Sequence, residues 1–125
     1  MDVATALLKV PTQNLRIPRA DYGRVWAAAE QRAIERGPGD YYLAGVVITF
    51  RWIARQAHRT PVTRAVRSAM PETLDTEYMA ALAASRSTKL HPMRVDMARG
   101  AVAVLGWVGH STGEPSLTKP LADTG

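Results

Sequence analysis

Residues 40–59 of the chain read DYYLAGVVITFRWIARQAHR. From Tyr41 to Phe50 every residue except Thr49 is of an apolar type. A helix through this run is apolar all round for about three turns, and such a helix is buried in a protein core. The run ends at Arg51, well short of the roughly 18 residues that a membrane span needs. The stretch therefore predicts a central core helix around which the rest of the chain is arranged.

Helical spacing of apolar residues predicts further helices on both sides of this core. One is expected from about residue 19 to the Gly-Pro-Gly sequence at 37–39, after which Asp40 occupies the N-cap position of the central helix. A short helix is expected over 61–70, because Thr60-Pro61 is a cap followed by proline at the first helical position. Two more are expected over 73–86 and from His91-Pro92 to Gly109.

These elements predict an all-α fold, a small helical bundle of four main helices plus one short helix. We expect an N-terminal arm at 1–18 whose apolar residues pack on the body, a helical domain at 19–109 and a mobile C-terminal tail at 110–125. The tryptophans Trp26, Trp52 and Trp107 lie on apolar stripes and are expected in the core.

The two halves of the chain resemble one another. The pattern Gly45-x-Val47 followed by Trp52 recurs 55 residues later as Gly100-x-Val102 followed by Trp107. One interpretation is a repeat of two antiparallel helical hairpins about a pseudo-twofold axis, in which Gly45 and Gly100 allow the central helices to approach closely. The other is chance similarity between alanine-rich amphipathic helices.

Composition sets limits on function. A chain of 125 residues with 46% hydrophobic and 22% charged residues is typical of one globular domain. It has no cysteine, which excludes thiol chemistry and disulfides, and we expect a cytoplasmic location without a secretory signal. None of the three histidines has a partner at metal-ligand spacing. We therefore expect no metal, no cofactor and no enzymatic activity, unless a site is assembled across the fold.

The distribution of charge is the main functional feature. No acidic residue lies between Asp40 and Glu72, and this segment contains His58 and five arginines, Arg51, Arg55, Arg59, Arg64 and Arg67. On the predicted helices the first three arginines share one face and the last two lie on the outer face of the short helix. Such a patch attracts an acidic protein, a phosphate backbone or anionic lipid. The alternative is a solvated face whose arginines pair with Glu72, Asp75 and Glu77.

Residues 53–67 also resemble part of a helix-turn-helix, with Thr60-Pro61 opening the would-be recognition helix. The match departs from the motif at His58 and Arg59 in the turn and at Arg64, where an aliphatic side chain is expected. The simpler alternative is two helices joined by a tight turn.

Tyr41 and Tyr42 begin the central helix and cannot both face inward, so one is a candidate interface anchor. From these features we expect a small regulatory protein that docks an acidic protein partner through its arginine face. Self-association into a homodimer through an apolar helix face is a further option. The alternative function is a DNA-binding regulator that uses residues 53–67.

Overall fold

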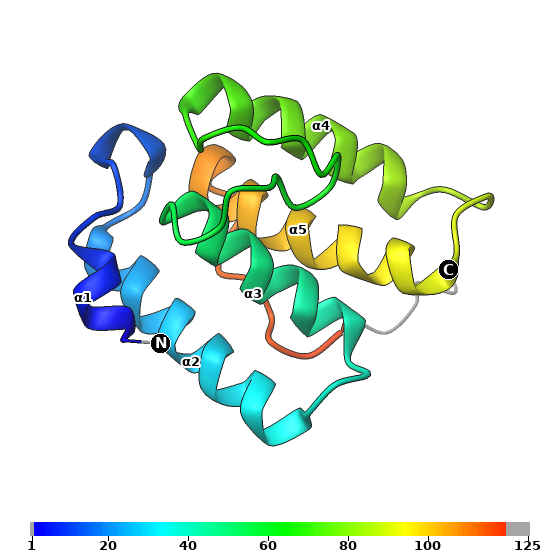
Figure 1. The fold of residues 1–125 in the computed structure, drawn as a ribbon, viewed down its shortest axis with the longest axis horizontal. Coiled ribbons are helices and arrows are strands. Elements are labelled where there is room, and N and C mark those ends of the chain that lie inside the picture. The colour runs from blue at the N-terminus through cyan, green and yellow to red at the C-terminus, as the bar shows by residue number, and fades with distance from the viewer. Residues whose placement is uncertain (1, 120–125) are drawn as a thin grey trace.

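A computed structural model describes residues 2–119 of the chain and shows the predicted all-α fold (Figure 1). Its elements are α1 (Val3–Leu7), a 3-10 turn η1 (Thr12–Asn14), α2 (Arg19–Arg36), α3 (Tyr41–Ile53), α4 (Pro71–Ser85) and α5 (Pro92–His110). Each main helix begins or ends where the sequence predicts. Asp40 caps α3 by accepting from the Leu43 amide at 3.0 Å, and His91 caps α5 by accepting from the Met93 amide at 3.1 Å.

The two most apolar helices, α3 and α5, lie side by side at the centre of the molecule (Figure 1). Gly45 of α3 faces the backbone of Met97, and Gly100 of α5 faces the backbone of Tyr42 and Val46. A methyl group added at Gly100 would lie 2.7 Å from the Val46 nitrogen, closer than real Cβ atoms approach another atom. The predicted role of both glycines is confirmed. The contact is also reciprocal, because each glycine faces the residue three positions before the other, which is a local twofold relation between α3 and α5.

The outer helices pack on this central pair in different ways. Helix α4 makes the more extensive contact with α5, where Ala81 is buried and Tyr78 lies against Gly106. Helix α2 packs on α3 through large aromatic rings, which keep these two backbones farther apart than those of α4 and α5. Tyr22 and Phe50 meet edge to face with 5.1 Å between ring centres, and the Tyr22 hydroxyl donates to the Phe50 carbonyl at 2.7 Å. The three predicted core tryptophans are all buried.

The segment that follows α5 packs against the body. Pro115 is buried, Leu117 packs on the core, and the Tyr42 hydroxyl donates to the Ser116 carbonyl at 2.8 Å. Glu114 pairs with Arg24 of α2. Residues 111–119 are thus held at several points, and the rest of the predicted mobile tail, 120–125, lies outside the described residues. The N-terminal arm packs on the body as expected, with Ala6 and Val10 buried.

The predicted short helix over 61–70 is wrong. Residues 54–70 form an irregular loop that runs from α3 to α4, the green segment between those helices in Figure 1. Arg55 and Arg64 adopt left-handed backbone conformations, with φ of 60° and 63°, and Arg59 pairs with Val66 in an isolated antiparallel bridge. The one short α-helix of the described chain is α1 instead.

Substituting Gly100→Ala should lower the free energy of unfolding by about 1–3 kcal/mol, because the added methyl forces α3 away from α5. Gly109→Ala is the matched control in the same helix, where nothing lies within 4 Å of the new methyl. It should leave stability unchanged or raise it by up to about 1 kcal/mol, since alanine favours the helix. Urea denaturation of both variants measures the difference. Equal free energies of unfolding for the two variants would mean that the close contact of α3 and α5 at Gly100 does not stabilise the fold.

Candidate functional site

The loop of residues 54–70, called here the arginine loop, carries most of the predicted site residues. Arg55, Arg59, Arg64, Arg67 and His58 are all exposed on it. Arg55, His58 and Arg67 line a small hollow of about 130 Å³ together with Val66, whose side chain is 70% exposed. Arg59 reaches across the loop and donates to the Arg64 carbonyl at 2.9 Å. The structure therefore brings five of the eight predicted residues onto one loop, although not on the helical faces that the spacing predicted.

The other three predicted residues lie elsewhere. Arg51 is bound by Glu30 of α2, with contacts of 2.8 Å and 2.6 Å from its guanidinium to the two carboxylate oxygens. Tyr42 is buried. Tyr41 is half-buried at the first residue of α3, about 18 Å along the helix axis from Ile53, where the arginine loop begins. The expectation that Arg51 shares a face with Arg55 and Arg59 is wrong, because the helix ends at Ile53.

A buried carboxylate holds the arginine loop against the body. Glu77 of α4 is only 2% exposed. One of its oxygens accepts from the Val62 and Thr63 amides at 2.9 Å and 3.1 Å, and the other from the Thr63 hydroxyl at 2.7 Å. The Ala65 amide, which would bond the Pro61 carbonyl in the predicted short helix, donates to the Thr60 hydroxyl at 3.0 Å instead. Three hydrogen bonds compensate for much of the cost of burying this charge.

Two further side chains fix the far end of the arginine loop. The Trp52 indole donates to the Arg67 carbonyl at 2.8 Å, and the buried Asn14 side chain donates to the Ala69 carbonyl at 2.9 Å. Arg55 also reaches the Ala69 carbonyl, at 3.3 Å. The loop is therefore irregular in conformation but held to the helices at both ends. Its arginines lie on a supported backbone, and Arg55 and Arg59 also bond carbonyl groups of the loop, which reduces the entropy lost when a partner binds.

The alternative in which these arginines pair with acids just downstream finds no support in the described chain. Within residues 2–119, none of Arg55, Arg59, Arg64 and Arg67 forms an ion pair with a carboxylate. Asp75 instead contacts His110, at 3.2 Å, and Glu77 binds the loop backbone. The positive charge of the arginine loop is thus not neutralised by neighbouring described side chains.

The helix-turn-helix interpretation fails on geometry. The segment from Pro61 to Met70 contains no helix, so the second helix of the motif does not exist there. Its apolar stripe does not form either, since Ala69 is buried while Val66 and Met70 are exposed.

Glu77 is the important residue that the sequence-based prediction misjudged, because it was considered as a partner for the arginines of a solvated face and not as a buried group. The position of Glu77 relative to apolar residues of the same helix predicts its burial. Leu74, Glu77 and Ala81 follow one another at three and four residues, so the carboxylate lies on the buried stripe of α4. A carboxylate at such a position must find hydrogen-bond donors.

Comparisons with known proteins do not identify the chain. No family model matches it, and no curated protein or solved structure matches it significantly. No helix among the described residues is long and apolar enough to cross a membrane. Residues 2–119 also contain no cluster of three or more potential metal-binding side chains.

Substituting Glu77→Gln should release the arginine loop, because an amide cannot accept all three hydrogen bonds with the strength of a carboxylate. We expect stability to fall by about 1–3 kcal/mol and the Val62 and Thr63 amides to exchange faster with deuterium. Glu72→Gln, on the exposed surface of the same helix, is the control. Unchanged exchange at both amides would contradict the proposed restraint.

The Glu30–Arg51 pair predicts part of the acid response. Burial by itself raises the pKa of the Glu30 carboxyl, but hydrogen bonds from Arg51 and Trp26 and the charge of Arg51 outweigh burial and lower that pKa. The pair therefore stabilises the fold above the pKa of an unfolded glutamate, about 4.3, and this contribution is lost as pH falls through the lowered folded value.

At neutral pH, Glu30→Gln should lower the free energy of unfolding by about 1–2 kcal/mol. Below about pH 4 the free energies of unfolding of the variant and the wild type should become more similar. Denaturation curves recorded between neutral and acid pH measure both values. Glu35→Gln, exposed on the same helix, is the control variant. A constant difference across the range would exclude a linked titration of Glu30.

Proposed function

We propose that the chain is a non-enzymatic interaction protein that docks an acidic protein partner through the arginine loop. The observation that supports this most directly is the set of four arginines on one supported loop, none of which pairs with a carboxylate in the described part of the chain. Unpaired guanidinium groups held near one another raise the local concentration of anionic partners and pair with carboxylates through two parallel hydrogen bonds.

The surroundings of these arginines favour a protein over DNA as the partner. The exposed Val66 lies among Arg55, Arg67 and His58, so the surface combines charge with an apolar contact point. Protein interfaces typically have such an apolar centre with a polar rim. A reader of the DNA major groove usually inserts a helix, and residues 54–70 form none.

Binding of a fluorescent glutamate-rich peptide tests the proposal. Wild type should bind the peptide at low salt, and the triple variant Arg55→Glu, Arg59→Glu and Arg67→Glu should lose binding because the loop then repels carboxylates. A second variant with glutamine at the same positions removes charge but keeps donors, and should bind weakly. Helical circular dichroism should persist in both, since the substituted residues lie outside the helices.

The matched control reverses three exposed cations outside the arginine loop, Lys9, Arg16 and Arg86. It has the same net charge as the triple glutamate variant and should retain most of the binding. Equal loss in both variants would show only a response to net charge and would exclude the loop as the site. Binding of a short DNA duplex, with log affinity falling by about 3 to 4 per log unit of salt, would favour phosphate as the ligand instead.

A further inference from the structure

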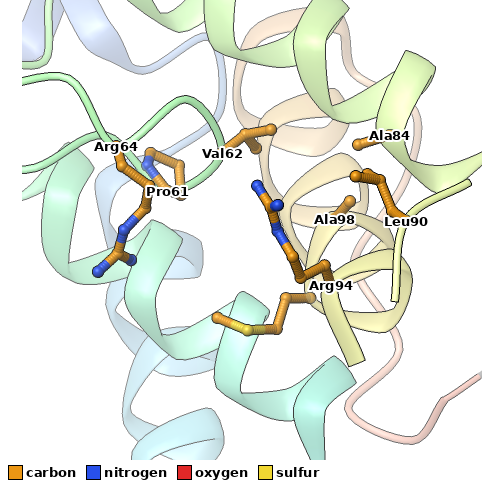
Figure 2. A pocket seen from close by; sticks show the side chains of 8 residues that line it. Pro61, Val62, Arg64, Ala84, Leu90, Arg94 and Ala98 are labelled. Atoms are coloured by element: carbon orange, nitrogen blue, oxygen red, sulfur yellow. The ribbon is translucent and has the colours of Figure 1, made fainter. Parts of the chain in front are cut away.

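A larger hollow lies beside the arginine loop, between that loop, α4 and α5 (Figure 2). Its volume is about 360 Å³. The apolar residues that line it are Pro61, Val62, Ala84, Leu90, Met97 and Ala98. Two arginines, Arg64 and Arg94, complete the lining. This size is at the lower end of that of ligand pockets, and is ample for one large side chain.

Arg94 gives this hollow its chemical character. Its side chain extends from α5 into the space and brings the guanidinium toward Val62, whereas Arg64 points away from it (Figure 2). Arg94 forms no ion pair with any carboxylate of residues 2–119. Glu77, which binds the Val62 amide, already accepts three hydrogen bonds from the loop. A guanidinium beside apolar walls suits a carboxylate that is attached to an apolar group.

The exposure of the hollow favours a peptide over a free small molecule. Arg94 is exposed, so a small ligand there would keep much of its surface in water, whereas small-molecule sites usually enclose most of their ligand. A peptide does not need such enclosure, because it continues beyond the cavity. Arg64 of the lining belongs to the arginine loop, whose charge is complementary to an acidic chain.

We propose that this hollow receives a large apolar side chain of the acidic partner, while a carboxylate next to that side chain pairs with Arg94. The assignment rests on the proposed function and adds to it the kind of sequence that is recognised: an acidic segment with one apolar anchor. The arginine loop attracts the segment, and the hollow determines where along the segment it binds. Apolar anchors that fill pockets commonly dominate the affinity of an interface.

Two fluorescent peptides of glutamate and serine, which differ only in a central phenylalanine or serine, test the assignment on the full chain. Wild type should bind the phenylalanine peptide about tenfold more tightly, as expected for burial of one large side chain. Ala84→Phe fills the hollow from the half-buried face of α4 and should abolish this preference while leaving the serine peptide unaffected. Arg94→Gln should weaken binding of the phenylalanine peptide.

Ala83→Phe is the matched control, since Ala83 is exposed, adjacent in sequence and not part of the lining. It should preserve the preference for the phenylalanine peptide. Equal affinity of wild type for the two peptides, or equal effects of Ala83→Phe and Ala84→Phe, would overturn the assignment. Phenylpropionate that binds as tightly as the phenylalanine peptide would also overturn it, because the hollow would then be a small-molecule site.

The same measurements separate this inference from the proposed function. If the wild type binds both peptides equally and the triple glutamate variant of the arginine loop binds neither, the loop is the docking surface and the hollow has no part in it. If that variant keeps the full preference for the phenylalanine peptide, the hollow binds the anchor and the role of the loop is wrong. Failure of the wild type to bind either peptide would overturn both.

Discussion

The backbone contact between α3 and α5 determines the arrangement of the other elements. Because Gly45 and Gly100 have no side chains, the two apolar helices approach until backbone touches backbone. Each helix then has one remaining apolar side to cover. The side of α5 is covered by α4 with small residues such as Ala81, and the side of α3 is covered by α2 through the rings of Tyr22, Trp26 and Phe50. Residues 111–119, which pack against α2 and α3, complete the covering.

The arginine loop depends on this core for its conformation. It begins directly after α3, and its second residue, Arg55, has a left-handed backbone conformation. It is tied to Glu77 of α4, to Trp52 of α3 and to Asn14 near the N-terminus. A negative charge therefore lies buried beneath a loop whose own charged side chains are all arginines. The arrangement keeps the loop ordered without neutralising its arginines, because Glu77 is occupied by backbone amides and not by guanidinium groups. The hollow that contains Arg94 exists for the same reason, since the tethered Pro61 and Val62 form one of its walls.

Most of the fold could be predicted because it depends on local patterns. The N-caps Asp40 and His91 and the apolar periods are properties of short stretches, and they placed the first residues of four helices to within about two positions, although α3 ends at Ile53 and not at Arg59. The failure over 61–70 has a specific cause. Thr60-Pro61 and the spacing of Val62, Ala65 and Val66 favour a helix locally, but the Ala65 amide donates to the Thr60 hydroxyl instead of to the Pro61 carbonyl. Farther along, Trp52 and Asn14 bond the carbonyls of Arg67 and Ala69 and hold the segment in its irregular course. Tertiary contacts of this kind override local propensity.

The sequence by itself determined that four apolar-striped helices form, that two glycines allow the central pair to meet, and that positive charge is concentrated between Asp40 and Glu72. Only the tertiary structure decided which cations share a surface. Arg51 is separated from the other predicted site residues because it pairs with Glu30, and Tyr42 is buried. Arg94 lies beside the arginine loop, which is about thirty residues earlier in the chain. The physical reason is that helix periodicity is encoded by near neighbours, whereas ion pairing and cavity lining depend on side chains that only the packed core brings together.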